Sequence, residues 1–299
     1  MRYQALIEKL NTLAVDCAEN VPMRQHTTFR IGGAARLIAQ AADDEQLRQI
    51  LLLCKEHALP HFILGNGSNL CVKDTGLDCV VLSTNGLQNK DVSDDNRISC
   101  GAGLRLSELC GFALRHSLTG LEFAYGIPGT VGGAVFMNAG AYGGEMKDIV
   151  ESVRFLDETL SWCELPANAL HFSYRHSVFA QNHGIITNVT LRLRRGDTEK
   201  IKAAMDDVML RRKTKQPLDM PSAGSVFKRP EGQFAGALIE QCGLKGKQIG
   251  GARVSEKHAG FIVNTGGASA ADVRALIALI QQVVAHETGF FLIPEILFV

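Results

Sequence analysis

Residues 126–145, GIPGTVGGAVFMNAGAYGGE, decide how the rest of the sequence is interpreted. The stretch is rich in glycine and alanine, and its one charged residue is Glu145 at its end. Glycine allows the backbone to take positive φ and to approach a ligand closely. The bare N–H groups of such a loop form a concave anion site that suits a pyrophosphate. For a single cluster of this kind, a small-residue connection packed under a sheet is the alternative explanation.

Two further glycine-containing turns follow apolar stretches. LGNGSNL at 64–70 follows the run HFIL, and Gly32-Gly33 follows TTFRI. Three loops that could each receive part of a dinucleotide favour a bound cofactor over three structural turns. The fingerprint of a nicotinamide-binding Rossmann unit is absent, because Leu70 stands where GxGxxG has its third glycine.

The composition excludes several classes of protein. A chain of 299 residues with 46% hydrophobic and 21% charged residues is typical of a globular protein of two or three domains. The formal net charge is zero, so no electrostatic attraction to nucleic acid or to an anionic membrane is expected. No apolar run approaches the roughly 20 residues that span a bilayer. The N-terminal segment has no uninterrupted apolar signal core.

The eight cysteines are scattered, with no CxxC pair and mostly apolar neighbours. This pattern favours buried thiols in a reducing compartment over disulfides or a zinc site. No HExxH motif occurs, and Pro60 would break a helix between His57 and His61, so no metal site is expected. The cytoplasm is the expected location.

Hydrophobic periodicity and breaker residues predict an alternation of helices and strands. We expect helices over residues 1–20, 42–57, 106–116, 198–215, 234–242 and 269–287. We expect strands on both sides of Gly32-Gly33 and over residues 61–65, 79–84, 149–156, 184–195, 259–264 and 290–299, the last paired inside a sheet. Basic residues gather at the end of the helix over 198–215, as the helix dipole prefers, and we interpret this helix as a domain boundary. After this helix, the order of elements favours an α+β third domain.

Two residues near the C-terminus could carry chemistry. Ser225 lies in PSAGSVFKRP, where a serine usually serves as a turn or cap residue, and AGSVF is not the nucleophile elbow GxSxG. Glu295 is the one acid in FFLIPEILFV. A carboxylate in an apolar strand is unfavourable unless it is paired or protonated, and a raised pKa suits a general acid. An edge strand that leaves Glu295 in water is an equal alternative.

Basic residues offer possible anion contacts. Arg175, which follows Tyr174 in HFSYRHS, could clamp a carboxylate with its fixed fork of donors, although a plain surface arginine is commoner. The basic end of the helix over 198–215 could bind a diphosphate, or it could simply be a solvated helix end. Its basic residues are Arg211, Arg212, Lys213 and Lys215.

Taken together, these stretches resemble one family closely: the UDP-N-acetylenolpyruvoylglucosamine reductases, flavoenzymes that complete UDP-N-acetylmuramate in peptidoglycan synthesis. The motifs that carry the resemblance are TTFRIGG (27–33), LGNGSNL (64–70), GIPGTVGGAVFMNAGAYGGE (126–145), SYRHSVF (173–179), PSAGSVFKRP (221–230), IGGARVSEKHAGFIVN (249–264) and PEI (294–296). They cover nearly the whole chain in the family's order, which makes the resemblance specific. The pattern is similar to the shorter subtype, which lacks an inserted loop bearing a substrate-capping tyrosine, and Arg229 in FKRP is in keeping with that subtype.

The resemblance implies an α+β fold. Two subdomains would bind FAD, as in the vanillyl-alcohol oxidase (PCMH-type) superfamily, and a C-terminal α+β domain would bind the substrate. We expect these parts at residues 1–85, 86–197 and 198–299. FAD would be held noncovalently by two glycine loops. The implied cofactor-binding residues are Gly65, Asn66, Gly67, Ser68, Asn69, Gly129, Thr130, Gly132, Gly133, Asn138, Ala139, Gly140 and Ala141.

The resemblance also implies a reaction. NADPH would reduce FAD by hydride transfer and leave, and UDP-N-acetylglucosamine enolpyruvate would take its place. Hydride from flavin N5 would add to C3 of the enolpyruvyl group. Arg175 and Glu295 would stabilise the enolate-like intermediate and Ser225 would protonate C2, while the flavin carries the redox chemistry. The implied substrate-binding residues are Tyr174, Lys215 and Arg229, and a monomer is expected.

Two positions depart from the family's pattern. Leu297 stands where an arginine is common two places after the glutamate, and Cys71 stands where a second leucine is usual after GSNL. Two other functions remain open: an oxidase or dehydrogenase of another small molecule on the same fold, and a flavin- or nucleotide-binding module without turnover. The joint presence of Arg175, Ser225 and Glu295 in their motifs favours the reductase.

Overall fold

The computed structural model describes residues 2–299, and the chain divides into two compact units. Unit 1 comprises the N-terminal residues through Glu19, Leu37–Asn66 and Cys79–Leu210. Unit 2 comprises Asn20–Arg36, Gly67–Asp78 and Arg211–Val299. Each unit therefore contains stretches that are far apart in the sequence. Helices and strands occur together throughout, so the fold is α+β as predicted.

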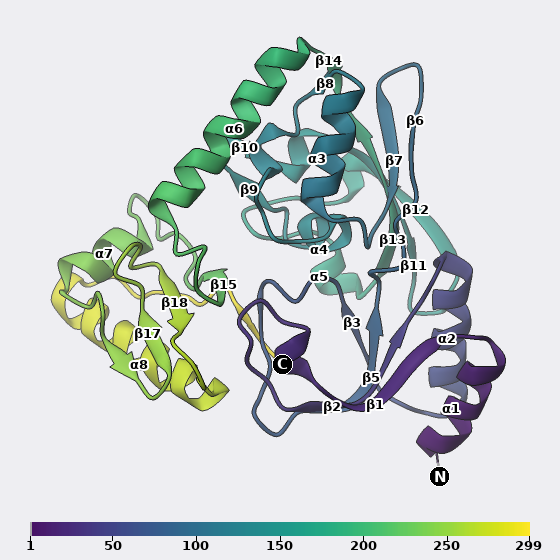
Figure 1. Ribbon diagram of the computed structural model, residues 1–299, viewed down its shortest axis with the longest axis horizontal. Helices are drawn as coiled ribbons and strands as arrows, with labels where there is room; N and C mark the ends of the chain where they lie inside the picture. The colour runs from purple at the N-terminus through teal and green to yellow at the C-terminus, as the bar shows by residue number, and fades with distance from the viewer. Residues whose placement is uncertain (1) are drawn as a thin grey trace. The chain divides into compact units, whose positions relative to one another are not determined.

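The first part of the chain forms a four-stranded sheet in the order β1-β2-β5-β3. Its elements are α1 (Arg2–Thr12), β1 (Asp16–Pro22), β2 (Ala34–Gln40), α2 (Asp44–Glu56), β3 (His61–Leu64) and β5 (Leu77–Ser83). Helices α1 and α2 lie side by side (Figure 1). Asp43 caps α2 by accepting a hydrogen bond from Gln46 N at 2.8 Å. Strands β3 and β5 are parallel.

A five-stranded antiparallel sheet, in the order β12-β11-β13-β7-β6, forms the second part of unit 1. Its strands are β6 (Lys90–Val92), β7 (Arg97–Gly101), β11 (Val150–Leu156), β12 (Trp162–Pro166) and β13 (Ile185–Arg192). The helix α4 (Val131–Phe136) packs against β13 and β7 (Figure 1). The remaining elements of this part are α3 (Leu106–Arg115), β8 (Leu118–Thr119), β9 (Gly140–Ala141), β10 (Gly144–Glu145), α5 (Phe179–Asn182), β14 (Arg194–Arg195) and α6 (Thr198–Lys215). The last turn of α6, from Arg211 on, belongs to unit 2.

Unit 2 contains a four-stranded sheet in the order β15-β18-β17-β16, covered by α8 (Figure 1). Its elements are β4 (Leu70–Cys71), β15 (Ser222–Ser225), α7 (Ala235–Gln241), β16 (Gln248–Ile249), β17 (Ala252–Val254), β18 (Phe261–Asn264), α8 (Ala270–Thr288) and β19 (Leu297–Phe298). Four 3-10 turns complete the described chain: Met23–Gln25, Glu122–Ala124, Met146–Asp148 and Ala167–Ala169.

Two of the predicted elements at the N-terminal end are wrong in part. The helix expected over 1–20 ends at Thr12, because Ala14 takes a left-handed φ of 52° and the chain continues as β1; Met1 lies outside the described residues. The strand expected before Gly32-Gly33 does not form, because Phe29 and Ile31 turn inward and are at most 1% exposed in the core of unit 2. In the second case, tertiary burial overrides local pattern.

Two further predictions are wrong in part. The glycine loop contains the short helix α4, because Val131, Ala134 and Val135 bury one face of a turn that glycines disguise in the sequence. The strand expected over 290–299 is reduced to Leu297–Phe298, and it pairs in parallel with β4 rather than within the four-stranded sheet. Pro294 has no N–H for a ladder, and it forms only an isolated bridge with Phe227.

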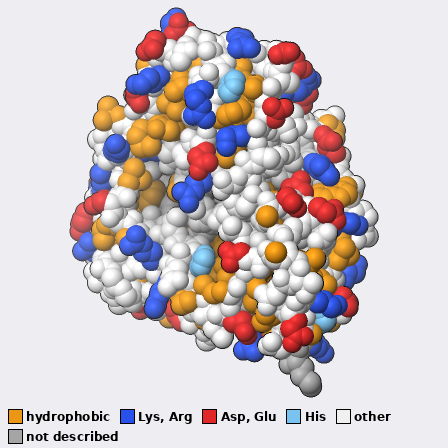
Figure 2. Space-filling model, turned by 45° about the vertical axis from the view of Figure 1, so that its right-hand side comes forward, with side chains coloured by type: hydrophobic (Ala, Val, Ile, Leu, Met, Phe, Trp, Pro, Cys, Tyr) orange, Lys and Arg blue, Asp and Glu red, His pale blue; other side chains and the backbone are white. Residues whose placement is uncertain are grey.

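All eight cysteines are free thiols. Four of them are buried, and burial raises the pKa of each of these thiols to about 12: Cys54, Cys71, Cys100 and Cys110. A thiol with such a pKa is an apolar packing group rather than a nucleophile. Lys and Arg side chains are interspersed with Asp and Glu on the face that Figure 2 shows, in keeping with the zero net charge. Among residues 2–299, no helix is both long and apolar enough to cross a membrane.

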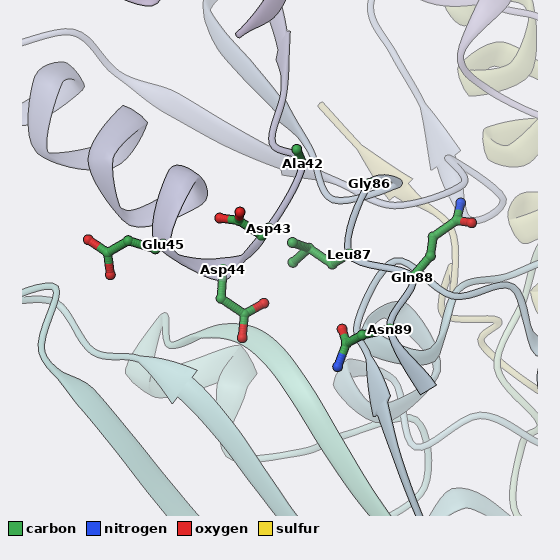
Figure 3. Close-up of a pocket in the computed structure, with 8 residues that line it drawn as sticks. All are labelled: Ala42, Asp43, Asp44, Glu45, Gly86, Leu87, Gln88 and Asn89. Carbon is green, nitrogen blue, oxygen red and sulfur yellow. The ribbon is translucent and has the colours of Figure 1, made fainter. Parts of the chain in front are cut away.

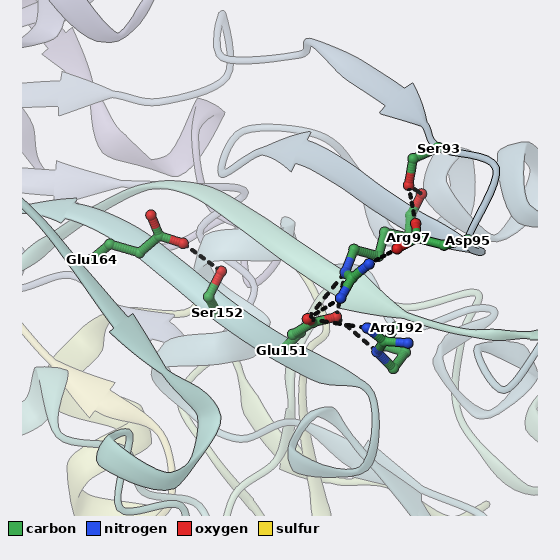
Figure 4. A network of polar contacts seen from close by, with 7 residues as sticks. All are labelled: Ser93, Asp95, Arg97, Glu151, Ser152, Glu164 and Arg192. Carbon is green, nitrogen blue, oxygen red and sulfur yellow. Dashed lines mark hydrogen bonds and ion pairs between the residues drawn. The ribbon is translucent and has the colours of Figure 1, made fainter.

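Glu151 joins three neighbouring strands of the five-stranded sheet. Its carboxylate on β11 accepts from Arg192 Nε on β13 at 2.9 Å and from Arg97 Nη2 on β7 at 2.8 Å (Figure 4). Hydrogen bonds from Arg97 and then from Arg192 lower the pKa of Glu151 to about 2. Arg97 also pairs with Asp95. The network ties strands that are distant in sequence.

We predict that Glu151→Gln destabilises the protein at neutral pH by about 1 kcal/mol, since the network is partly screened by solvent. The folded pKa is depressed, so the carboxylate contributes stability above its ordinary pKa and loses it as the pH falls towards 2. The difference in Tm between wild type and variant should therefore shrink between pH 6 and pH 3. Glu164→Gln, which removes a carboxylate that accepts from Ser152 Oγ in the same sheet, is the control. A difference that does not change with pH would contradict this account.

Candidate active site

The loop after β3 begins in unit 1 with Gly65 and Asn66. A β-carbon at Gly65 would lie 2.5 Å from Thr130 Oγ1, so the two glycine loops approach each other too closely for a larger residue. Asn66 Nδ2 donates to Pro128 O. The loop at 64–66 and the loop at 126–133 are therefore neighbours, although more than 60 residues separate them in sequence.

The same loop continues in unit 2 with Gly67, Ser68 and Asn69. Gly67 has a φ of +60°, and a β-carbon there would lie 2.2 Å from His26 O, so only glycine fits. Among the residues described, the backbone N–H groups of Asn66, Gly67 and Ser68 have no hydrogen-bond acceptor. Consecutive unpaired N–H groups in a turn suit an anionic oxygen, such as that of a phosphate.

The two glycines of α4 have different surroundings, and only one of them has no room for a side chain. Gly132 is buried, and a β-carbon there would lie 2.8 Å from Ala102 Cβ, so the packing of the fold requires it. Gly133 is exposed, and a β-carbon there would meet only Thr130 Oγ1 at 3.5 Å, an ordinary contact. Glycine weakens a helix, and no contact within the described residues excludes a β-carbon at 133, so this position is open to the close approach of a ligand.

After α4, the predicted cofactor residues Asn138, Ala139, Gly140 and Ala141 lead into the β9–β10 hairpin. Ala139 N donates to Ala134 O at 2.8 Å. The side chain of Asn138 is fully buried and makes hydrogen bonds only within the protein. The three residues that follow it, Ala139, Gly140 and Ala141, are half-buried.

Arg175 lies at the tip of a two-residue turn. Ser173 and His176 form an antiparallel bridge, and Tyr174 and Arg175 connect them. Arg175 takes a left-handed φ of +55°, which is uncommon for a residue with a long side chain. Its Nη2 donates to Gly140 O at 3.2 Å, and its guanidinium lies 5.0 Å from the centre of the Tyr174 ring. The turn therefore places Arg175 against the glycine loop, with Tyr174 exposed beside it.

Unit 2 brings Ser225 and Glu295 onto adjacent chain segments. Glu295 N donates to Val226 O at 2.7 Å, immediately after Ser225 at the end of β15. Ser225 Oγ lies 3.3 Å from Phe227 O, and both Ser225 and Glu295 are half-buried. Glu295 is thus neither in a long strand nor fully exposed, which differs from both predicted alternatives. Arg175, the third predicted catalytic residue, belongs to unit 1.

The two predicted basic substrate residues lie at exposed positions of unit 2. Lys215 is the last residue of α6. Arg229 follows the Ser225 turn, and its guanidinium lies 4.1 Å from the centre of the Phe234 ring, which is 60% exposed.

His258 lies near Ser225 and is half-buried, whereas the sequence, in which it belongs to the motif IGGARVSEKHAGFIVN, led us to expect a surface residue. The position that a β-carbon would take at Gly260 is 3.0 Å from His258 Cε1 and 3.5 Å from Ser225 Oγ. His258 Nδ1 accepts from Gly260 N at 3.1 Å, so the proton of the neutral ring is on Nε2. Burial lowers the pKa of His258, which favours this neutral form.

Gly32-Gly33 is not an open loop of the kind expected. Gly33 N donates to Lys73 O at 3.0 Å, and a β-carbon at Gly32 would lie 2.7 Å from Val72 Cβ. These glycines allow two chain segments of unit 2 to pack closely, and the amide of Gly33 is already hydrogen-bonded within the protein.

The departures at Leu297 and Cys71 do not disturb the segment that holds Glu295. Leu297 is 41% exposed, and its backbone N donates to Asn69 O at 2.9 Å, a contact that any residue except proline could make. Cys71 is fully buried and pairs with Phe298 across β4 and β19.

None of the predicted site residues lines the pocket of about 350 Å³ in unit 1 that Figure 3 shows. Its lining residues are Ala42, Asp43, Asp44, Glu45, Gly86, Leu87, Gln88 and Asn89. Three adjacent carboxylates would repel a diphosphate, and Asp43 already serves as the cap of α2.

Comparisons with known proteins identify both halves of the chain. Residues 35–163 match the family described as "FAD binding domain". Residues 216–299 match the family described as "UDP-N-acetylenolpyruvoylglucosamine reductase, C-terminal domain". An alkyldihydroxyacetonephosphate synthase, 15% identical with a TM-score of 0.50 over 64% of this chain, shares the fold alone.

Closer relatives match over nearly the whole length. The UDP-N-acetylenolpyruvoylglucosamine reductase of Caldanaerobacter subterraneus subsp. tengcongensis is 50% identical over 93% of this chain and 91% of its own. That of Clostridioides difficile is 46% identical over 97% and 96%. The crystal structure of the Thermus caldophilus enzyme (MurB) has a TM-score of 0.81 at 36% identity, covering 95% of this chain and 98% of its own. The chain therefore belongs to the UDP-N-acetylenolpyruvoylglucosamine reductase family and carries an FAD-binding domain.

Proposed function

We propose that this chain reduces UDP-N-acetylglucosamine enolpyruvate to UDP-N-acetylmuramate with NADPH as the hydride donor, in the synthesis of peptidoglycan precursors. Family membership supports the reaction class. The observation that carries the proposal is the placement of Ser225 and Glu295. These residues are 70 positions apart in sequence, and their segments are joined by a 2.7 Å hydrogen bond from Glu295 N to Val226 O.

The glycine loops fit FAD. The unpaired N–H groups of Asn66, Gly67 and Ser68 suit its diphosphate, and the open face at Gly133 leaves room for a ring system. The residues that would hold FAD noncovalently are Gly65, Asn66, Gly67, Ser68, Asn69, Gly129, Thr130, Gly132, Gly133, Ala139, Gly140 and Ala141, with Asn138 contributing through its loop. When bound, FAD supplies the hydride that reaches C3 of the enolpyruvyl group after reduction by NADPH.

Three side chains would stabilise the negative charge that develops on the substrate and supply the proton that C2 receives. Arg175, held in a turn, would face the substrate carboxylate and the negative charge that develops on it. Glu295 can donate a hydrogen bond to that charge only when protonated, so this role requires a neutral carboxyl group. Ser225 would give its hydroxyl proton to C2. A serine hydroxyl is a weak acid, so it can act only on a strongly basic carbon.

The exposed positions of Tyr174, Lys215 and Arg229 suit contact with the sugar nucleotide, whose diphosphate would be met by the two basic residues. The three-part division at residues 1–85, 86–197 and 198–299, a monomeric state and a cytoplasmic location stay predictions.

We predict that Gly133→Leu weakens FAD binding by more than tenfold while the thermal stability of the apoprotein is unchanged or raised. A side chain at 133 has room in the protein and favours a helix, but it would occupy the space that the ring system needs. FAD affinity can be measured by fluorescence titration. Gly111→Leu in α3 is the matched control, because a β-carbon at Gly111 meets only the end of Arg115 at 3.6 Å. Equal FAD affinity in both variants would argue against the proposed position of the flavin.

We predict that Ser225→Ala retains FAD and its reduction by NADPH, but slows reoxidation by the enolpyruvyl substrate by about 10²–10⁴-fold, the usual contribution of a proton donor. Anaerobic stopped-flow absorbance of the flavin separates the two half-reactions. Ser222→Ala removes a hydroxyl from the same strand and should reoxidise like wild type. If wild-type flavin stays reduced with this substrate and is rapidly reoxidised by oxygen instead, the chain is an oxidase of another compound.

A further inference from the structure

Asn138 is a buried polar residue that the proposed reaction does not yet explain. Its side chain is 0% exposed, and its backbone takes a left-handed φ of +42°, a conformation that asparagine tolerates better than most residues. Its Nδ2 donates to Glu145 Oε2 at 2.8 Å and to Ser173 O at 2.9 Å, and its Oδ1 accepts from Lys147 N at 3.0 Å.

These hydrogen bonds leave the side chain unable to donate to a cofactor. An amide group has two N–H donors, and both donate to protein acceptors here. Direct binding of FAD by the Asn138 amide would require breaking one of these buried hydrogen bonds, which costs free energy even though Ser173 O also accepts from His176 N and Glu145 Oε2 also pairs with Lys147 Nζ. A ligand-binding role for the side chain is therefore disfavoured.

The same hydrogen bonds connect Asn138 to Arg175 from two directions. Ser173 O belongs to the bridge that closes the Tyr174–Arg175 turn. Gly140 O, which accepts from Arg175 Nη2 at 3.2 Å, lies two residues after Asn138 in the chain. Asn138 thus fixes both the base of the turn and the segment that holds the guanidinium.

We propose that Asn138 is a positioning residue for Arg175. Its buried amide holds the 173–176 turn against the glycine loop, and this fixes the guanidinium where the substrate carboxylate would bind. The inference rests on the proposed function for the role of Arg175, and it assigns Asn138 an effect on the substrate half-reaction rather than on FAD affinity.

The test compares the two half-reactions in Asn138→Gly, because glycine keeps the left-handed backbone and removes only the side chain. FAD affinity and reduction by NADPH should stay within about twofold of wild type. Reoxidation by the enolpyruvyl substrate should slow by roughly 10- to 100-fold, as expected for a charged group displaced by about 1 Å. If Asn138→Gly does not fold, the isosteric Asn138→Asp, which also removes the donor to Ser173 O, takes its place.

A double-mutant cycle decides whether the effect passes through Arg175. In an Arg175→Ala background, Asn138→Gly should cause no further slowing, because there is no guanidinium left to position. Asn264→Ala is the matched control: this buried asparagine also donates to two backbone carbonyls, those of Phe29 and Arg30, but in unit 2. If Asn264→Ala slows reoxidation, the double variant with Arg175→Ala should be slowed by the product of the two single factors.

Three results would overturn the inference: full multiplication of the Asn138→Gly and Arg175→Ala effects, a loss of FAD affinity as the main effect, or reoxidation at the wild-type rate. Failure of the proposed function is separate, since it appears as wild-type flavin that the enolpyruvyl substrate does not reoxidise. In that event, the crystal structure of the Asn138→Gly holoprotein tests the positioning role of Asn138. A displaced 173–176 turn supports the positioning role, and an unmoved turn rejects it.

Discussion

The parallel pairing of β19 with β4 is the contact on which the candidate site in unit 2 depends. Leu297 N donates to Asn69 O, Val299 N to Cys71 O and Lys73 N to Val299 O, at 2.9, 3.2 and 2.7 Å. The last residues of the chain are thereby held against the segment that directly follows the Gly67 turn. Asn69 Nδ2 also donates to Glu295 O at 3.2 Å. A predicted catalytic carboxyl group and a predicted cofactor loop thus share one hydrogen-bonded segment.

Burial explains why this pairing is stable. Phe29, Ile31 and Cys71 are at most 1% exposed, and they pack in one core with apolar residues of α8 such as Leu276 and Ile280. Removing such side chains from water contributes about 1.5–3 kcal/mol each. The short stretches 20–36 and 67–78 therefore fold with the C-terminal region because their apolar residues complete its core. The backbone pairing then satisfies hydrogen bonds that burial would otherwise leave unmade.

Different physical constraints explain the glycines at different positions of the candidate site. At Gly67, positive φ and a carbonyl oxygen 2.2 Å from the β-carbon position exclude any side chain. Gly132 is required by packing against Ala102, whereas a β-carbon at Gly133 would make only an ordinary contact with Thr130 Oγ1. A glycine that the fold does not need is the stronger indicator of a ligand, because it has a cost in helix stability that nothing inside the protein offsets. The motif alone does not separate these cases.

Local pattern alone determined the amphipathic helices such as Asp44–Glu56 and Ala270–Thr288, the strand Ile185–Arg192, and the motifs that identify the family. It succeeded there because caps, breakers and periodicity are properties of neighbouring residues. Only the tertiary structure decided that the chain after Ala14 becomes a strand and that the C-terminal segment pairs with β4. It alone also showed that the Asn138 side chain donates to Ser173 O in the turn that carries Arg175. The hydrogen bond from Asn69 to Glu295 spans 226 positions. No local signal specifies such a contact, since it forms only when buried side chains from distant stretches meet in one core.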